Sequence, residues 1–298
     1  MQFTNPLPPV SPSEGLPERI RQRTVPPGQV VAWWLGGAGF VFKTSQGTQL
    51  YADPYLSDVV NDIFGQQRAF PPPLTADQAC PDVLICTHWH EDHLDPGSIP
   101  IIARNNPTAL LLMPPSALAR AVSWGVPRRQ ITTLKAGQTL GIKDITISAV
   151  AARHNAGVEG WEVSDGVCLI LEIDGMKIFF SGDTEYDTSL RNLRKLDFDS
   201  AFLSINGVGG NMNAHEAALL AWHWGVGTVV PMHHYLWKNP AACAEATLDP
   251  RLLESTYLKL GGIGQVIAPI VGEEIVLGQI SSGRRGHRFI SNAGTTQK

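Results

Sequence analysis

Three histidines and two aspartates lie within eight residues of this chain, in the segment 88–95, which reads HWHEDHLD. Imidazole nitrogens and carboxylate oxygens are donors that suit zinc, manganese or iron. His88 and His90 are two residues apart and can reach one point from an extended segment. Asp92 and His93 follow a tight turn and can aim at a second point a few Å away. A solvated polar loop is the alternative, but the full pattern is far more specific than a lone His-x-His, so we predict a metal site here.

The segments on either side predict where this motif sits in the fold. Val83 to Cys86 is a short apolar run that is typical of a buried strand. Asp95-Pro96-Gly97-Ser98 follows the motif and combines turn residues with helix-start residues. The motif is therefore expected in a loop at the carboxyl end of a strand, where open α/β sheets place their ligand sites.

Three later segments offer further donors, and each follows a strand-like run. His154 comes after residues 145–150, Asp183 after Phe-Phe-Ser-Gly, and the pair His233-His234 after Pro-Met. Alone, His154 is an ordinary loop histidine and Asp183 an ordinary turn residue. Their shared position after strands favours convergence on one groove.

With these segments the chain resembles the metallo-β-lactamase superfamily, whose hallmark His-x-His-x-Asp-His stands here as residues 88–93. The resemblance runs from about Val31 to about Val276. Within the superfamily it is most similar to the L-ascorbate-6-phosphate lactonase branch and related metal-dependent hydrolases. The closer match rests on Ala32–Gly36, on Trp124–Pro127 and on the His233-His234 pair with Trp237 after it.

The resemblance implies two divalent metal ions, manganese or zinc, and assigns their ligands. The first metal would be held by His88, His90 and His154, the second by Asp92, His93 and His233, with Asp183 as a bridge. His233 is preferred to His234 because the family's ligand follows the Pro-x pair at the strand end. Asp92 and Asp183 would also act in catalysis.

Four other residues are candidates for supporting roles. His234, Asn206 and Tyr235 are expected to contact the substrate, although each can instead pack or cap locally. Asp53 follows a predicted strand and precedes a proline, so it is either a turn residue or a carboxylate that orients a ligand histidine.

The activity that the resemblance implies is hydrolysis by a metal-bound hydroxide. We expect a lactonase acting on a sugar-acid lactone, with or without a phosphate, or on a similar small ester. A phosphodiesterase for cyclic nucleotides or phospholipid-like diesters is the first alternative, because the same nucleophile serves phosphorus. A di-iron redox protein is the second alternative.

The order of predicted elements indicates a mixed α/β protein, and the resemblance implies a four-layer αββα sandwich. Residues 1–28 are rich in proline and are expected to form an extended arm with a short helix near residues 18–23. A single hydrolase domain is expected over residues 29–280 and a polar tail over 281–298. Within the domain, residues 61–74 are expected to form a loop at the mouth of the site. Residues 241–260 are expected to be mostly helical, with Pro250 interrupting or restarting the helix.

Composition limits the other possibilities. The chain has 298 residues, of which 43% are hydrophobic and 17% charged, and a formal net charge of −4. No polycationic run indicates nucleic-acid binding, no apolar run is long enough for a membrane span, and no secretory signal is visible. We therefore expect a cytoplasmic enzyme with a small-molecule substrate, which can form a homo-oligomer.

Overall fold

Two β-sheets packed face to face form the centre of the molecule. The computed structural model describes residues 15–238 and 249–278, and within these residues each sheet has seven strands. In the first sheet the order is β14-β1-β2-β3-β4-β5-β6, and in the second it is β13-β12-β11-β10-β9-β8-β7. The strands of the first sheet are β1 (Gln29–Gly36), β2 (Gly39–Lys43), β3 (Gln49–Ala52), β4 (Val83–Ile85), β5 (Leu110–Met113), β6 (Ile131–Thr133) and β14 (Glu274–Gly278). Those of the second are β7 (Thr139–Ile142), β8 (Ile145–Ala151), β9 (Val167–Ile173), β10 (Met176–Phe180), β11 (Ser200–Ser204), β12 (Thr228–Met232) and β13 (Gln265–Val266).

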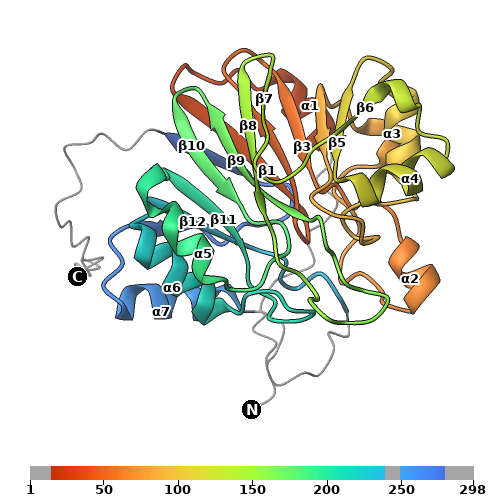
Figure 1. Ribbon diagram of the computed structural model, residues 1–298. Helices are drawn as coiled ribbons and strands as arrows, with labels where there is room; N and C mark the ends of the chain where they lie inside the picture. Colours follow the sequence, from red (N-terminus) through yellow and green to blue (C-terminus); the bar gives the residue numbers. More distant parts are fainter. Residues whose placement is uncertain (1–14, 239–248, 279–298) are drawn as a thin grey trace, which may run out of the picture.

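Helices cover the outer faces of both sheets (Figure 1). The helices are α1 (Leu16–Gln22), α2 (Val59–Phe64), α3 (Ile99–Asn105), α4 (Pro115–Ser123), α5 (Thr188–Arg191), α6 (Ala214–Trp224) and α7 (Pro250–Lys259). Buried side chains of α1, α3 and α4 pack on the first sheet, and those of α5, α6 and α7 pack on the second. The predicted αββα sandwich is confirmed.

The alternation of side chains along β1 shows why the chain forms these layers. Trp34 belongs to the core between the two sheets, whereas Trp33 belongs to the core under α1, α3 and α4. Because successive side chains of a strand point to opposite faces, a run that is apolar at every position must be covered on both faces. Between the sheets, the ring of Phe202 meets Phe40 and Phe42 edge-on, with centroids 4.9 and 5.0 Å away.

The two halves of the chain are interlocked. Strand β14, close to the end of the described residues, returns to the first sheet and pairs antiparallel with β1. The first sheet therefore needs residues from both ends of the domain. No helix in the described ranges combines the length and the apolar character that crossing a bilayer requires.

One expectation about local structure needs correction, and one is made more specific. Residues 61–74 do not form a loop throughout, because α2 extends to Phe64 before the irregular stretch begins. Helix α7 begins at Pro250, which occupies the first helical position where a missing N–H costs nothing. The preceding part of the predicted helix, residues 241–248, lies outside the described residues. The short helix expected in the arm is α1.

Candidate metal centre

Five strands end next to the candidate site and deliver its side chains. Asp53 follows β3, His154 follows β8, Asp183 follows β10, His233 follows β12, and the motif of residues 88–93 follows β4. The Asp183 loop passes very close to the loop after β4. A Cβ on Gly182, whose φ is +51°, would lie 2.9 Å from the Cβ of Thr87, so this crossing requires glycine.

Three buried histidines form what we call the first donor group: His88, His90 and His154. Nδ1 of His90 lies 2.9 Å from Nε2 of His88 and 3.1 Å from Nε2 of His154. Three imidazole nitrogens thus face one small volume.

The second donor group consists of Asp92, His93 and His233. Nε2 of His233 lies 3.3 Å from Oδ2 of Asp92 and 3.3 Å from Nε2 of His93. Within each group the potential ligand atoms lie no more than 4.8 Å apart.

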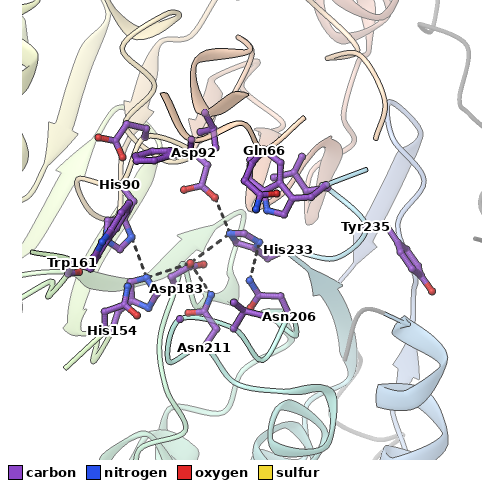
Figure 2. Close-up of a pocket in the computed structure, with 18 residues that line it drawn as sticks. Gln66, His90, Asp92, His154, Trp161, Asp183, Asn206, Asn211, His233 and Tyr235 are labelled. Atoms are coloured by element: carbon purple, nitrogen blue, oxygen red, sulfur yellow. Dashed lines mark hydrogen bonds and ion pairs between the residues drawn. The ribbon is translucent and has the colours of Figure 1, made fainter. Parts of the chain in front are cut away.

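Asp183 lies between the two groups. Its Oδ2 is 3.4 Å from Nε2 of His93, 3.5 Å from Nε2 of His233 and 3.6 Å from Nε2 of His154. Asn211 donates a hydrogen bond of 2.7 Å to the same oxygen. Figure 2 shows the carboxylate between His154 on one side and His233 on the other. A single oxygen within reach of both groups is the arrangement that a bridging ligand needs.

The outward nitrogens of three of these histidines have hydrogen-bond partners. Nδ1 of His93 donates to Oδ2 of Asp53 at 2.8 Å, and Nε2 of His90 donates to the carbonyl oxygen of Trp161 at 3.1 Å. Nδ1 of His88 lies 3.2 Å from the hydroxyl oxygen of Thr87, whose own proton is donated to Asp53. A proton held on the outer nitrogen leaves the lone pair of the inner nitrogen free for a metal.

His233 has a comparable partner in Asn206. Nδ2 of Asn206 lies 3.2 Å from Nδ1 of His233, and the amide oxygen Oδ1 has no partner among the described residues. If the amide is turned by 180°, this oxygen accepts the Nδ1 proton and Nε2 becomes a free donor. The buried Nδ1 of His154 and Oδ1 of Asn211 also lack partners in the described part of the chain.

The protonation states of the two groups differ. Burial lowers the pKa of His88 and His90 and brings that of His154 to about 4. Burial of His93 and His233 is outweighed by the neighbouring carboxylates, chiefly that of Asp183, so the pKa of both imidazoles is raised.

The two carboxyl groups are ionised. Burial raises the pKa of Asp92 and Asp183, but the surrounding histidines outweigh it. The net result is a pKa of about 2 for Asp92 and one well below the ordinary range for Asp183.

These residues fit divalent cations. The first donor group presents three neutral imidazoles. Their inner nitrogens face one another, so their lone pairs can be directed at one cation. The second group and Asp183 place two ionised carboxylates beside imidazoles that carry extra protons, and a cation would take the place of those protons. The donors are nitrogen and oxygen without thiolate, which suits zinc or manganese.

A cavity of about 400 Å³ opens onto this cluster. That volume suits a small molecule. Asn206 and Tyr235 line the cavity as expected for substrate contacts, although Tyr235 lies apart from the ligand cluster in Figure 2. His234 does not line it. Its ring is buried and stacked on Trp34 at 4.7 Å, so its placement does not fit the expected contact with a substrate.

Several residues of the site escaped the sequence reasoning. Asn211 donates a hydrogen bond to Asp183, and the carbonyl group of Trp161 accepts one from His90. Phe64 and Gln66 line the cavity; they belong to the stretch 61–74 expected at its mouth but were not singled out. Asn211 had a weak signal, since it lies in a glycine-containing loop between β11 and α6. The other three lie in stretches without periodicity.

A family model described as "Beta-lactamase superfamily domain" matches residues 50–234, more than half of the chain. Among curated proteins, the chain is similar to a protein named "Probable L-ascorbate-6-phosphate lactonase UlaG" from Salmonella choleraesuis (strain SC-B67). The two are 25% identical over 265 residues, which cover 75% of this chain and 75% of that protein.

Solved structures share the fold. One is Igni18, titled a novel metallo hydrolase from the hyperthermophilic archaeon Ignicoccus hospitalis KIN4/I. It has a TM-score of 0.63 and 20% identity, with 85% of this chain and 100% of that chain covered. Another is an isothiocyanate hydrolase from Delia radicum gut bacteria, with a TM-score of 0.65, 18% identity, and 84% and 100% covered. At these identities the likeness concerns the fold alone.

Proposed function

The chain belongs to the β-lactamase superfamily and is one of its metal-dependent hydrolases, and on that premise we propose that it is a lactonase that holds two divalent cations. Its substrate is a lactone or a similar small ester, bound in the cavity above the two donor groups. The bound metal is manganese or zinc.

One observation carries the proposal: Oδ2 of Asp183 lies within 3.6 Å of a histidine nitrogen from the first donor group and of two from the second. We assign His88, His90 and His154 to one cation, Asp92, His93 and His233 to the other, and Asp183 to both. Asp53 orients His93 through its Nδ1 proton.

When bound, a pair of divalent cations supplies Lewis acidity, which polarises a carbonyl group and makes water more acidic. Ring opening forms one C–O bond from water and breaks the ring C–O bond. Asp92 lines the cavity and is ionised, so it can accept a hydrogen bond from the attacking water and orient it. The proton that the water loses passes by way of this carboxylate to the leaving ring oxygen.

We propose a lactone and not another ester because the chain is similar to curated proteins that are named as lactonases. Those named as L-ascorbate-6-phosphate lactonases match three quarters of this chain and three quarters of their own length. Asn206 and Tyr235 line the cavity and are the remaining candidates for holding the ring.

Turnover of purified protein loaded with manganese or zinc tests the proposal. We expect lactones to be opened with a kcat/KM at least about tenfold above that for a chromogenic phosphodiester, and Asp183→Ala to remove nearly all activity. His215→Ala is the control, because His215 is exposed on α6 and its side chain hydrogen-bonds Thr256, away from the cavity. Turnover of the phosphodiester without opening of any lactone would reject the assignment.

A further inference from the structure

Three aromatic residues, Phe64, Trp161 and Trp237, line the cavity and are called the aromatic wall here. From this wall and from the charges around it we propose that the substrate carries an uncharged, apolar substituent, and no phosphate group. This inference rests on the proposed lactonase function and specifies the part of the substrate that does not react.

Two residues of the aromatic wall expose a large part of their surface. Phe64 is 43% exposed and Trp161 is 41% exposed, and their ring centroids lie 5.3 Å apart. Contiguous exposed apolar surface at a cavity mouth marks a binding site, because covering it with a ligand removes it from water. An alkyl or aromatic substituent gains this hydrophobic stabilisation, whereas a phosphate group does not.

The wall is held in place from two sides. Trp161 stacks on Trp89, with centroids 6.5 Å apart, and Phe64 is the last residue of α2. The stretch after α2 pairs with the Trp237 segment through two backbone hydrogen bonds, from Ala69 to Leu236 and from Lys238 to Gln67. These contacts therefore fix the position of the apolar surface.

The wall also lies next to the proposed reaction centre. The ring of Trp161 contacts the ring of His90 at 5.6 Å, and its carbonyl group accepts the outer proton of that same histidine. Figure 2 shows the two residues side by side. A substituent packed on Trp161 thus places an attached lactone ring over the first donor group.

A phosphate would find no cationic side chain here. Among the described residues, no lysine or arginine lines the cavity. Glu91, Asp92 and Asp183 line the cavity. Two of these carboxylates are assigned to the cations, and Glu91 is paired with Arg120.

Two arginines beside cavity-lining residues have other partners. The guanidinium group of Arg68 is buried and donates to the carbonyl oxygens of Tyr55 and Phe70. Arg120 lies over the ring of Trp89, 4.1 Å from its centroid, and pairs with Glu91 at 3.7 Å. A phosphate on the substrate would have to compete with these contacts, whereas an uncharged substituent would leave them intact.

Three γ-lactones provide the substrate test: one with a hexyl or phenyl side chain, one of a sugar acid, and the phosphate ester of that sugar-acid lactone. With the metal-loaded protein we expect kcat/KM for the apolar lactone to exceed both others by at least about tenfold. A higher value for the phosphorylated lactone overturns the inference and leaves the lactonase proposal standing.

Variants of the wall test which residues bind the substituent. Phe64→Ala and Trp161→Ala should each lower the ratio of kcat/KM for the apolar lactone to kcat/KM for the sugar-acid lactone by about tenfold. Ile63→Ala and Trp222→Ala are matched controls, because these side chains are 53% and 42% exposed and do not line the cavity. An apolar preference that survives both wall variants contradicts the assignment to the wall.

A binding measurement separates this inference from the proposed function. A lactam with the same apolar side chain, which resists ring opening, should bind the metal-loaded protein in calorimetry. Trp161→Ala, which keeps the backbone carbonyl group that holds His90, should weaken binding about tenfold at unchanged metal content. If no lactone is opened, the lactonase proposal fails, and the lactam titration still decides whether the wall binds apolar groups. Equal binding by wild type and Trp161→Ala overturns the inference.

Discussion

At the scale of single residues, the site depends on side chains that never touch a metal or a substrate. Asp53 accepts hydrogen bonds from the backbone N–H of Thr87 at 2.7 Å, from its hydroxyl group at 2.7 Å and from Nδ1 of His93 at 2.8 Å. It therefore ties the start of the motif to one of its ligands.

Asp53→Asn tests this role with almost no change in size. All three neighbours are donors, so the new NH₂ group must face one of them and cannot accept its proton. We expect metal affinity to fall by about 10- to 100-fold, as measured by competition with a chelator. Asp82→Asn is the control, since Asp82 accepts the N–H of Gln49 at the other end of β3. Equal loss in both variants would argue against a specific role.

The pKa shifts of the histidines predict how metal binding depends on pH. Protons compete with cations for imidazole nitrogens. In the first donor group burial lowers every pKa below 6.5, so these ligands stay neutral well into the acid range. In the second group the carboxylates outweigh burial and raise the pKa of both imidazoles above 6.5, so metal affinity there is lost as the pH falls.

We therefore expect the metal content to fall from about two ions per chain at about pH 8 to about one at about pH 6. Mass spectrometry of protein equilibrated at each pH and freed of unbound metal would show this. Simultaneous loss of both ions would contradict the difference between the groups.

At the scale of elements, α1 is attached to the first sheet by a buried lysine. Nζ of Lys43 in β2 donates to the carbonyl oxygens of Ile20 and Arg21, which are free because they lie in the last turn of the helix. This contact connects α1 to β2 without touching the site.

Lys43→Met should lower the free energy of unfolding by about 2 kcal/mol, because the carbonyl groups of the helix lose their donor. Chemical denaturation measures this value, and metal content should not change. Lys143→Met is the control, since Lys143 is half exposed and pairs with Asp82 at the surface, where ion pairs contribute little. If Lys43→Met lowered the free energy of unfolding as little as the control does, the helix would be held by its apolar face alone.

At the scale of the whole molecule, the parts that sequence reasoning predicted are those with strong local signals. Short apolar strands with clear turns predicted a mixed α/β protein, as in the hairpin whose turn residues Asp174 and Gly175 both have positive φ. The αββα layout itself was implied by the resemblance. The four donor segments could be grouped because each follows a predicted strand, and the resemblance assigned the metal ligands within them.

The aromatic wall could not be predicted in this way. Helix α2 has six residues, too few for a helical period to show, and Trp161 lies in an irregular loop. Their contact joins residues almost a hundred positions apart, and no local pattern encodes it. For His234 the local pattern was misleading. Its place beside His233 suggested a role in the cavity, whereas its ring packs on Trp34.

We propose that loops from both sheets bind two cations and that the carboxylate of Asp183 contacts both. The number of metal ions bound per chain tests this proposal. Full-length protein equilibrated with manganese or zinc at about pH 8 should retain about two ions per chain, and Asp183→Ala should lose most of them while circular dichroism shows the same fold. Wild-type protein that retains no metal, or an Asp183→Ala variant that retains as much as wild type, would contradict the account.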